Sequence, residues 1–164
     1  MNCFTHDMTE QTVSPILIKN RGSSYLTLYY FTEHSDSLLH RDSRQILYFQ
    51  TMEDLEAFCK KNGLQPEDEL LEYDFDLPME NPIHFSRVLN NWNLLNTASG
   101  ILGMYFEGDC RKYNSLYDLL FRLSTPIEPI PPTYRVSERD YNYILKVFRK
   151  KDRCFKRFAL YEWE

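Results

Sequence analysis

Six carboxylates gather within ten residues in the stretch EDELLEYDFD, which runs from Glu67 to Asp76 and ends in an Asp-Phe-Asp. An Asp-x-Asp that follows an apolar stretch can hold Mg²⁺ or Mn²⁺, because carboxylates are hard oxygen ligands. The same density of charge can instead form a solvated surface, or a docking face for a basic macromolecule. The stretch therefore leaves three chemical alternatives open.

A metal-dependent transferase or hydrolase built on Asp74 and Asp76 would also need groups that bind phosphate. The chain has five glycines and contains no phosphate-binding loop, zinc-protease motif or serine-hydrolase motif. From Leu71 to Leu77 apolar and acidic residues alternate, which is the period of a half-buried strand. A strand places Glu72, Asp74 and Asp76 on one charged face without any metal. We therefore expect no metal, no cofactor and no catalytic residue here.

The histidines and cysteines offer weaker candidates for chemistry. His34 is followed by Asp36 and His40 by Asp42, so an acid–base pair is one interpretation and a solvated polar loop is the other. His84 falls in the first turn of a predicted helix, where a surface or capping role is expected. The four cysteines are about fifty residues apart with no Cys-x-x-Cys pair, which predicts reduced thiols that are mostly buried.

Charge is divided unevenly along the chain, whose net charge is −5. Residues 1–133 hold ten basic residues against nineteen acidic ones, whereas residues 134–164 hold nine against five. An acidic body disfavours nonspecific binding of nucleic acid, which depends on Lys and Arg, and suits a basic partner. The basic run KVFRKKDRCFKR, residues 146–157, keeps a nucleic-acid-binding regulator as a further alternative.

Helix and strand periods predict a single α+β domain over residues 1–164, with a small antiparallel sheet packed against several amphipathic helices. The predicted strands cover residues 15–19, 24–32, 44–50, 71–77 and about 158–163. The predicted helices cover residues 52–62, 82–99, 111–123 and 137–150. Residues 33–43 and the proline-rich connector 124–134 are predicted loops, and the order of residues 1–14 is left open.

Local start signals support two of these helices. Thr51 stands three residues before Asp54, which is close to a capping box, and Ser137 precedes two acids in a first turn. The N-terminus lacks the features of a secretory signal, and the longest apolar stretch, residues 25–31, is too short to cross a bilayer as a helix. We therefore expect a cytoplasmic protein.

The succession ILYFQTMEDLEAFCKKNGL, LLEYDFD, VLNNWNLLNTASG and KYNSLYDLLF resembles a group of small bacterial immunity proteins. These proteins protect a cell from contact-dependent growth inhibition or from other polymorphic toxins. The resemblance covers about residues 46–121 and lies in the order of aromatic and acidic blocks. It implies a protein that binds and blocks a toxin domain, and toxins that attack DNA or RNA are typically basic at the active site. It carries over no catalytic residue.

The residues and the resemblance together predict a binding protein rather than an enzyme. We expect it to neutralise a cognate toxin, most simply a basic cytosolic nuclease, by occluding the toxin's active or substrate-binding surface with an acidic face. No membrane and no nucleic acid are expected among its partners. The candidate partner-binding residues are acids with one aromatic anchor: Glu67, Asp68, Glu69, Glu72, Tyr73, Asp74 and Asp76.

Overall fold

The computed structural model describes residues 11–42, 44–76, 83–125, 130–131 and 133–163. Its strands are β1 (Thr12–Asn20), β2 (Ser23–Phe31), β3 (Asp36–Leu38), β4 (His40–Arg41), β5 (Gln45–Tyr48), β6 (Leu71–Asp74) and β7 (Ala159–Leu160). Its helices are α1 (Met52–Lys61), α2 (Phe85–Leu102), α3 (Asn114–Ser124), α4 (Glu138–Val147) and α5 (Lys151–Phe155), with 3-10 turns η1 (Glu107–Asp109) and η2 (Arg111–Tyr113). This content confirms the predicted α+β class. Among the described residues, no helix is both long enough and apolar enough to cross a membrane.

The main sheet has the strand order β3-β2-β1-β6, and its centre is the hairpin of β1 and β2. The hairpin was predicted, and it turns at Arg21 and Gly22, whose φ angles are 50° and 74°. The predicted all-antiparallel sheet is wrong in one respect, because β6 pairs with β1 in parallel, Ile16 opposite Leu71. A period-two pattern identifies a strand but says nothing about its partner or direction.

A second, smaller sheet has the order β4-β5-β7. The prediction of a loop over residues 33–43 is wrong, because this stretch contains β3 and β4. The predicted strand at 44–50 shortens to β5, which pairs antiparallel with β4 and in parallel with β7, Leu47 opposite Ala159. Such short strands are held by backbone hydrogen bonds, which polar residues form as well as apolar ones do.

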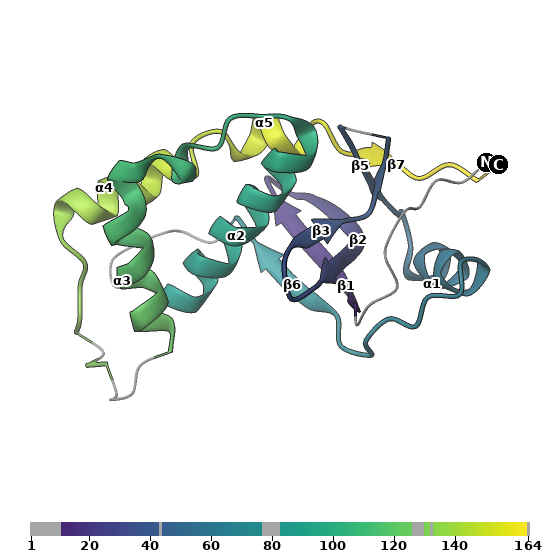
Figure 1. Cartoon of the computed structure of the whole chain (residues 1–164), viewed down its shortest axis with the longest axis horizontal. Helices are drawn as coiled ribbons and strands as arrows, with labels where there is room; N and C mark the ends of the chain where they lie inside the picture. The colour runs from purple at the N-terminus through teal and green to yellow at the C-terminus, as the bar shows by residue number, and fades with distance from the viewer. Residues whose placement is uncertain (1–10, 43, 77–82, 126–129, 132, 164) are drawn as a thin grey trace.

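Hydrophobic clusters lie on both faces of the β1–β2 hairpin. On one face Ile16, Ile18 and Tyr29 pack with α2 and the C-terminal helices. On the other face Leu26 and Leu28 pack with α1 and β5. Figure 1 shows this arrangement, with the hairpin between α2 and α1. Burial on both faces explains why the sequence of these strands is apolar almost without alternation.

The helix start signals are confirmed. The Thr51 side chain accepts the backbone N–H of Asp54 at 3.1 Å, and Ser137 does the same for Asp140 at 3.1 Å. α2 begins at Phe85, because the His84 side chain caps it by accepting the backbone N–H of Arg87 at 3.3 Å. The predicted start of that helix at residue 82 lies outside the described residues. The expected capping role of His84 is therefore confirmed.

The C-terminal region differs from its prediction. The helix predicted over residues 137–150 ends at Val147, and a separate short helix, α5, follows it. The predicted closing strand is confirmed as β7. Residues 126–129 and 132 of the proline-rich connector lie outside the described residues, as do residues 1–10, whereas residues 12–14 belong to β1.

Gly108 in η1 lies against two buried aromatic rings, and its substitution tests this packing. A Cβ at residue 108 would lie 2.5 Å from the Phe106 ring and 2.8 Å from the Trp92 ring, and both rings are buried. We expect Gly108→Ala to lower the free energy of unfolding by about 1–3 kcal/mol through overpacking. The measurement is chemical denaturation followed by circular dichroism.

Gly100, inside α2, provides the matched control. A Cβ there meets nothing within 4 Å. We expect Gly100→Ala to raise the free energy of unfolding by about 0.5–1 kcal/mol, because alanine is the better helix former. Equal effects of the two substitutions would contradict the packing described around Gly108.

Candidate functional site

The acidic stretch runs beside β1 from one end of that strand to the other. The backbone N–H of Glu67 donates to the carbonyl of Val13 at 2.8 Å, near the start of β1. β6 then pairs with the second half of β1. Asp76 reaches the turn that follows β1. The six carboxylates therefore lie at different places along one strand and have different surroundings.

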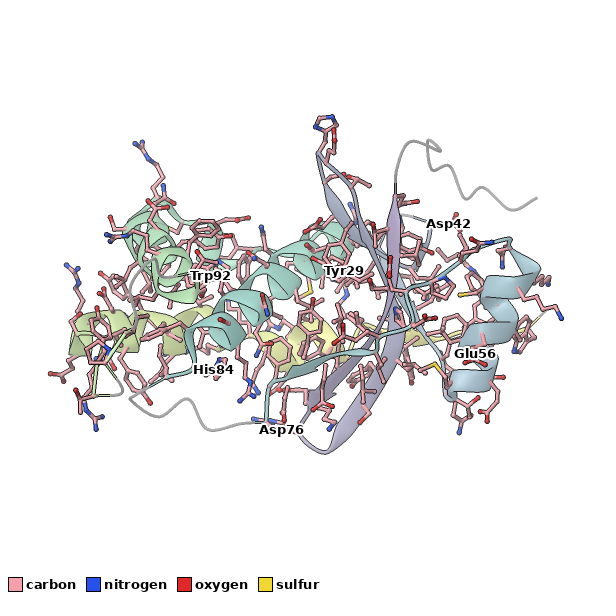
Figure 2. The ribbon with its side chains drawn as sticks, turned by 90° about the horizontal axis from the view of Figure 1, so that it is seen from below. Tyr29, Asp42, Glu56, Asp76, His84 and Trp92 are labelled. Atoms are coloured by element: carbon pink, nitrogen blue, oxygen red, sulfur yellow. The ribbon has the colours of Figure 1, made fainter. Side chains whose placement is uncertain are left out.

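Asp74 and Asp76 accept hydrogen bonds from backbone N–H groups at and near the hairpin turn. The Asp76 carboxylate accepts the backbone N–H of Arg21 and, at 3.3 Å, that of Gly22. Asp74 Oδ1 accepts the backbone N–H of Asp76 at 2.8 Å. Figure 2 shows Asp76 beside the turn of the β1–β2 hairpin, with Glu56 on α1 across the sheet. Asp76 stays exposed despite these contacts, and the role of the two acids as partner contacts stays a prediction.

The same contacts bear on the Asp-x-Asp metal site. Backbone N–H groups point at the Asp76 carboxylate, and this is the environment of a bound anion rather than of a metal ligand. Among the described residues, no three His, Cys, Asp or Glu side chains are placed so that they could hold a metal ion together. The two aspartates are therefore better described as turn-stabilising groups.

Tyr73 lies on the inward face of β6 and is half-buried, unlike the exposed Glu72 beside it, and its role as a partner anchor stays a prediction. Its ring stacks with that of Tyr29 at a centroid distance of 6.3 Å. Burial raises the pKa of the Tyr73 hydroxyl to about 12, and the nearby Asp36 carboxylate adds to the effect. Strand alternation explains the difference, because the residues between the acids of β6 must face the core.

The exposed acids of the stretch are Glu67, Asp68, Glu69, Glu72 and Asp76, and we call the first four, which lie before the hairpin-turn contacts, the acidic segment. Glu72 accepts a hydrogen bond from the Lys19 ammonium at 2.9 Å, and this bond raises the pKa of Lys19. The other three side chains are exposed on the loop before β6. These four candidates are exposed to a partner, as is Asp76.

A polar cavity of about 660 Å³ lies between the β2–β3 loop and α2. His34 and Asp36 both line it, so the structure brings together one of the two predicted acid–base pairs. The Asp36 carboxylate, however, accepts the Tyr29 hydroxyl at 3.3 Å, and no hydrogen bond joins it to His34 among the described residues. His40 Nδ1 donates instead to the Leu38 carbonyl at 2.8 Å.

The cysteines are free thiols where the structure describes them, and Cys59 and Cys154 are buried. Burial raises the pKa of the Cys154 thiol to about 12, although a hydrogen bond with Ser99 opposes the effect. The pKa of the Cys59 thiol is also raised by burial. A protonated, buried thiol is a poor nucleophile.

Sequence reasoning missed a second charged feature, which we call the basic pocket. The basic run does not form one helix, because α4 ends at Val147 and α5 begins at Lys151. Five cationic side chains of this run surround an opening of about 530 Å³. Its lining residues are Arg149, Lys150, Asp152, Arg153, Lys156 and Arg157. The available signal was Cys154 and Phe155, two buried apolar residues among the cations that follow the predicted end of the helix at residue 150.

The turn contacts of Asp76 give a direct test of its structural role. We expect Asp76→Ala to lower the free energy of unfolding by about 1.5–3 kcal/mol, because two backbone N–H groups lose a charged acceptor. The matched control is Glu69→Ala, which we expect to change it by less than about 0.5 kcal/mol. Urea denaturation measures both variants. An unchanged free energy of unfolding in Asp76→Ala would show that the turn does not depend on this carboxylate.

The buried tyrosines predict a loss of stability in alkali. The folded-state pKa of Tyr73, about 12, lies above the ordinary value of 10.0, so its contribution is complete below pH 10 and is lost between pH 10 and 12. Burial also raises the pKa of Tyr29. We expect Tyr73→Phe to reduce the alkaline slope of the unfolding free energy by up to about 1.4 kcal/mol per pH unit. Denaturation measured from pH 8 to 12 checks this, and identical slopes would contradict it.

Comparison with known proteins shows a shared fold. No protein-family model matches the sequence, and no curated protein matches it significantly. Among solved structures, the crystal structure of the SatS C-terminal domain in complex with bromine is similar, with 14% sequence identity and a TM-score of 0.55. The likeness covers 91% of this chain and 94% of that domain. At this identity it concerns the arrangement of the elements alone.

Proposed function

We propose that this chain is a bacterial immunity protein that acts in the cytoplasm by binding and neutralising a basic protein toxin. The observation that supports the proposal is the acidic segment, in which Glu67, Asp68 and Glu69 are exposed and consecutive. Glu72 extends the charge onto the edge strand β6. On this proposal the protein acts by occlusion and uses no cofactor.

The surroundings of the acidic segment suit a docking surface. Its first residue is tied to β1 through the Val13 carbonyl, and its last lies in a paired strand, so the loop is held at both ends. Preorganisation of this kind lowers the entropic cost of binding. Leu70 lies between the acids and is 40% exposed, which offers an apolar contact. Carboxylates around an apolar residue resemble the charged rim and apolar centre of a protein interface.

Electrostatics favours a partner with a positive surface. Glu72 shares its charge with Lys19, whereas no ion pair of the described residues involves Glu67, Asp68 or Glu69. Such a surface accelerates association with a cationic protein and makes the rate sensitive to salt. A nuclease has a cationic substrate surface because it must bind phosphates, so it is the class of toxin that this segment suits best.

The test is neutralisation of the toxic protein encoded beside this one, in cells that express both. We expect the wild-type chain to restore growth and to bind the toxin with a nanomolar Kd. The combined variant Glu67→Lys, Asp68→Lys and Glu69→Lys should weaken binding by at least about a hundredfold, because close charge pairs carry much of such an interface. Isothermal titration calorimetry at two salt concentrations measures the change.

A control with the same change in net charge separates the acidic segment from the overall charge. Glu33, Glu56 and Asp118 are exposed at scattered positions, and their joint replacement by Lys should leave binding within about threefold of wild type. Equal losses of affinity for the toxin in both variants would show that the acidic segment is not the interface. The absence of any neutralised toxin would contradict the proposed function itself.

A further inference from the structure

The basic pocket lies on the opposite side of α5 from the hydrophobic core. Cys154 and Phe155 point inward and are 2% and 1% exposed. Lys151 also points inward, where its ammonium donates to Asn20 Oδ1 at 2.8 Å and to the Phe75 carbonyl at 2.9 Å. These contacts fix the helix on the sheet. The other cations of α5 and its flanking turns are therefore presented together on the outer side.

The positive charge of the pocket is only partly offset within the described part of the chain, where Glu107 interacts electrostatically with Lys150. Asp152 is the one carboxylate that lines the pocket, and its oxygens accept Asn20 Nδ2 at 2.8 Å and Arg21 Nε at 2.9 Å. None of the ion pairs between described residues involves the five lining cations. Like charges held this close repel one another, and an anionic ligand would relieve that repulsion.

An aromatic ring lies beside the cations. Tyr105, from the loop after α2, is 63% exposed, and the Lys150 ammonium lies 5.7 Å from its ring centroid. The nearby Glu107 is already engaged by the Tyr113 hydroxyl at 2.8 Å and by Lys112 at 3.5 Å. An exposed ring next to an ammonium group, at the side of a cluster of cations, is the combination that binds a base and its phosphates.

The start of the acidic segment lies far from this pocket. Glu67 is bonded to Val13 near the start of β1, whereas α5 is bonded to Asn20 at its end. Seven strand residues separate these two points by about 23 Å, which is more than twice the Debye length of roughly 8 Å at physiological ionic strength. Glu72 lies nearer to Asn20, but the Lys19 ammonium pairs with it at 2.9 Å.

We propose that the basic pocket and Tyr105 together bind single-stranded nucleic acid. The guanidinium groups of Arg149, Arg153 and Arg157 hold successive phosphates, since their planar forks match phosphate oxygens. Tyr105 stacks with a base. Binding of this kind depends little on sequence and strongly on salt. The activity is additional to toxin binding and uses a different surface.

The experiment measures the fluorescence anisotropy of a labelled ten-nucleotide oligo-uridine and of the matching oligo-thymidine, titrated with the full chain. We expect binding at 50 mM NaCl that weakens with salt, with a log–log slope of about −0.7 for each phosphate contacted. Arg153→Glu with Arg157→Glu should weaken binding at least tenfold. Arg87→Glu with Arg122→Glu, exposed cations on α2 and α3, should change it less than twofold.

Substitutions of Tyr105 test whether the ligand of the pocket is a nucleic acid or another polyanion. We expect Tyr105→Ala to weaken oligonucleotide binding about fivefold or more and Tyr105→Phe to restore it, because the phenyl ring keeps the stacking surface. Tripolyphosphate, used as a competitor, should bind equally to all three forms. Thermal unfolding followed by circular dichroism confirms that each variant is folded.

Three results would overturn the proposal. The first is no oligonucleotide binding at 50 mM NaCl by the folded wild type. The second is an equal loss in the Arg87/Arg122 control, which would indicate a nonspecific charge effect. The third is self-association at low salt that the Arg153/Arg157 variant abolishes and the oligonucleotide does not displace. That result would show that the pocket binds the acidic segment of a second copy of the chain.

Discussion

Three segments that are distant in sequence meet at the turn between β1 and β2, and the arrangement of the charged surfaces depends on this meeting. Asn20 bonds to Lys151 and Asp152 of α5, and the backbone of Arg21 bonds to Asp76 after β6. Hydrogen bonds to charged groups contribute about 1.5–3 kcal/mol each when partly buried. The turn thereby joins the sheet, the end of the acidic stretch and the C-terminal helix.

The charged side chains of the acidic stretch and the basic run fall into two classes, those that contact the turn between β1 and β2 and those that do not. Near the turn, Asp76 and Lys151 form hydrogen bonds with backbone groups, and Asp152 forms an ion pair with Arg21. By contrast, Glu67, Asp68, Glu69 and the five cations that line the basic pocket take part in no ion pair among the described residues. Charges that stabilise the fold and charges available to ligands therefore alternate within the same short stretches of sequence.

Local signals predicted those parts of the fold that local chemistry determines. The hairpin, the caps at Thr51 and Ser137, and the strand character of residues 71–74 follow from turn residues, side-chain oxygens and alternation. The parallel pairing of β6 and the separate helix α5 could not be predicted, because both depend on contacts between distant segments. Alternation along residues 71–77 predicted that Tyr73 faces inward, but the sequence could not show that the exposed Asp76 accepts hydrogen bonds from the distant hairpin turn.

The parallel pairing of β5 with β7 has a kinetic consequence. It places Leu47 opposite Ala159, and the contact of Asn20 with Asp152 spans 132 residues. Closing such long loops costs chain entropy before any contact offsets it, and folds rich in distant contacts fold slowly. We expect the helices to form early and the seam between α5 and the sheet to close late. The folding rate of this chain is then limited by the slow formation of contacts between its N-terminal and C-terminal segments, rather than by the stability of any one helix.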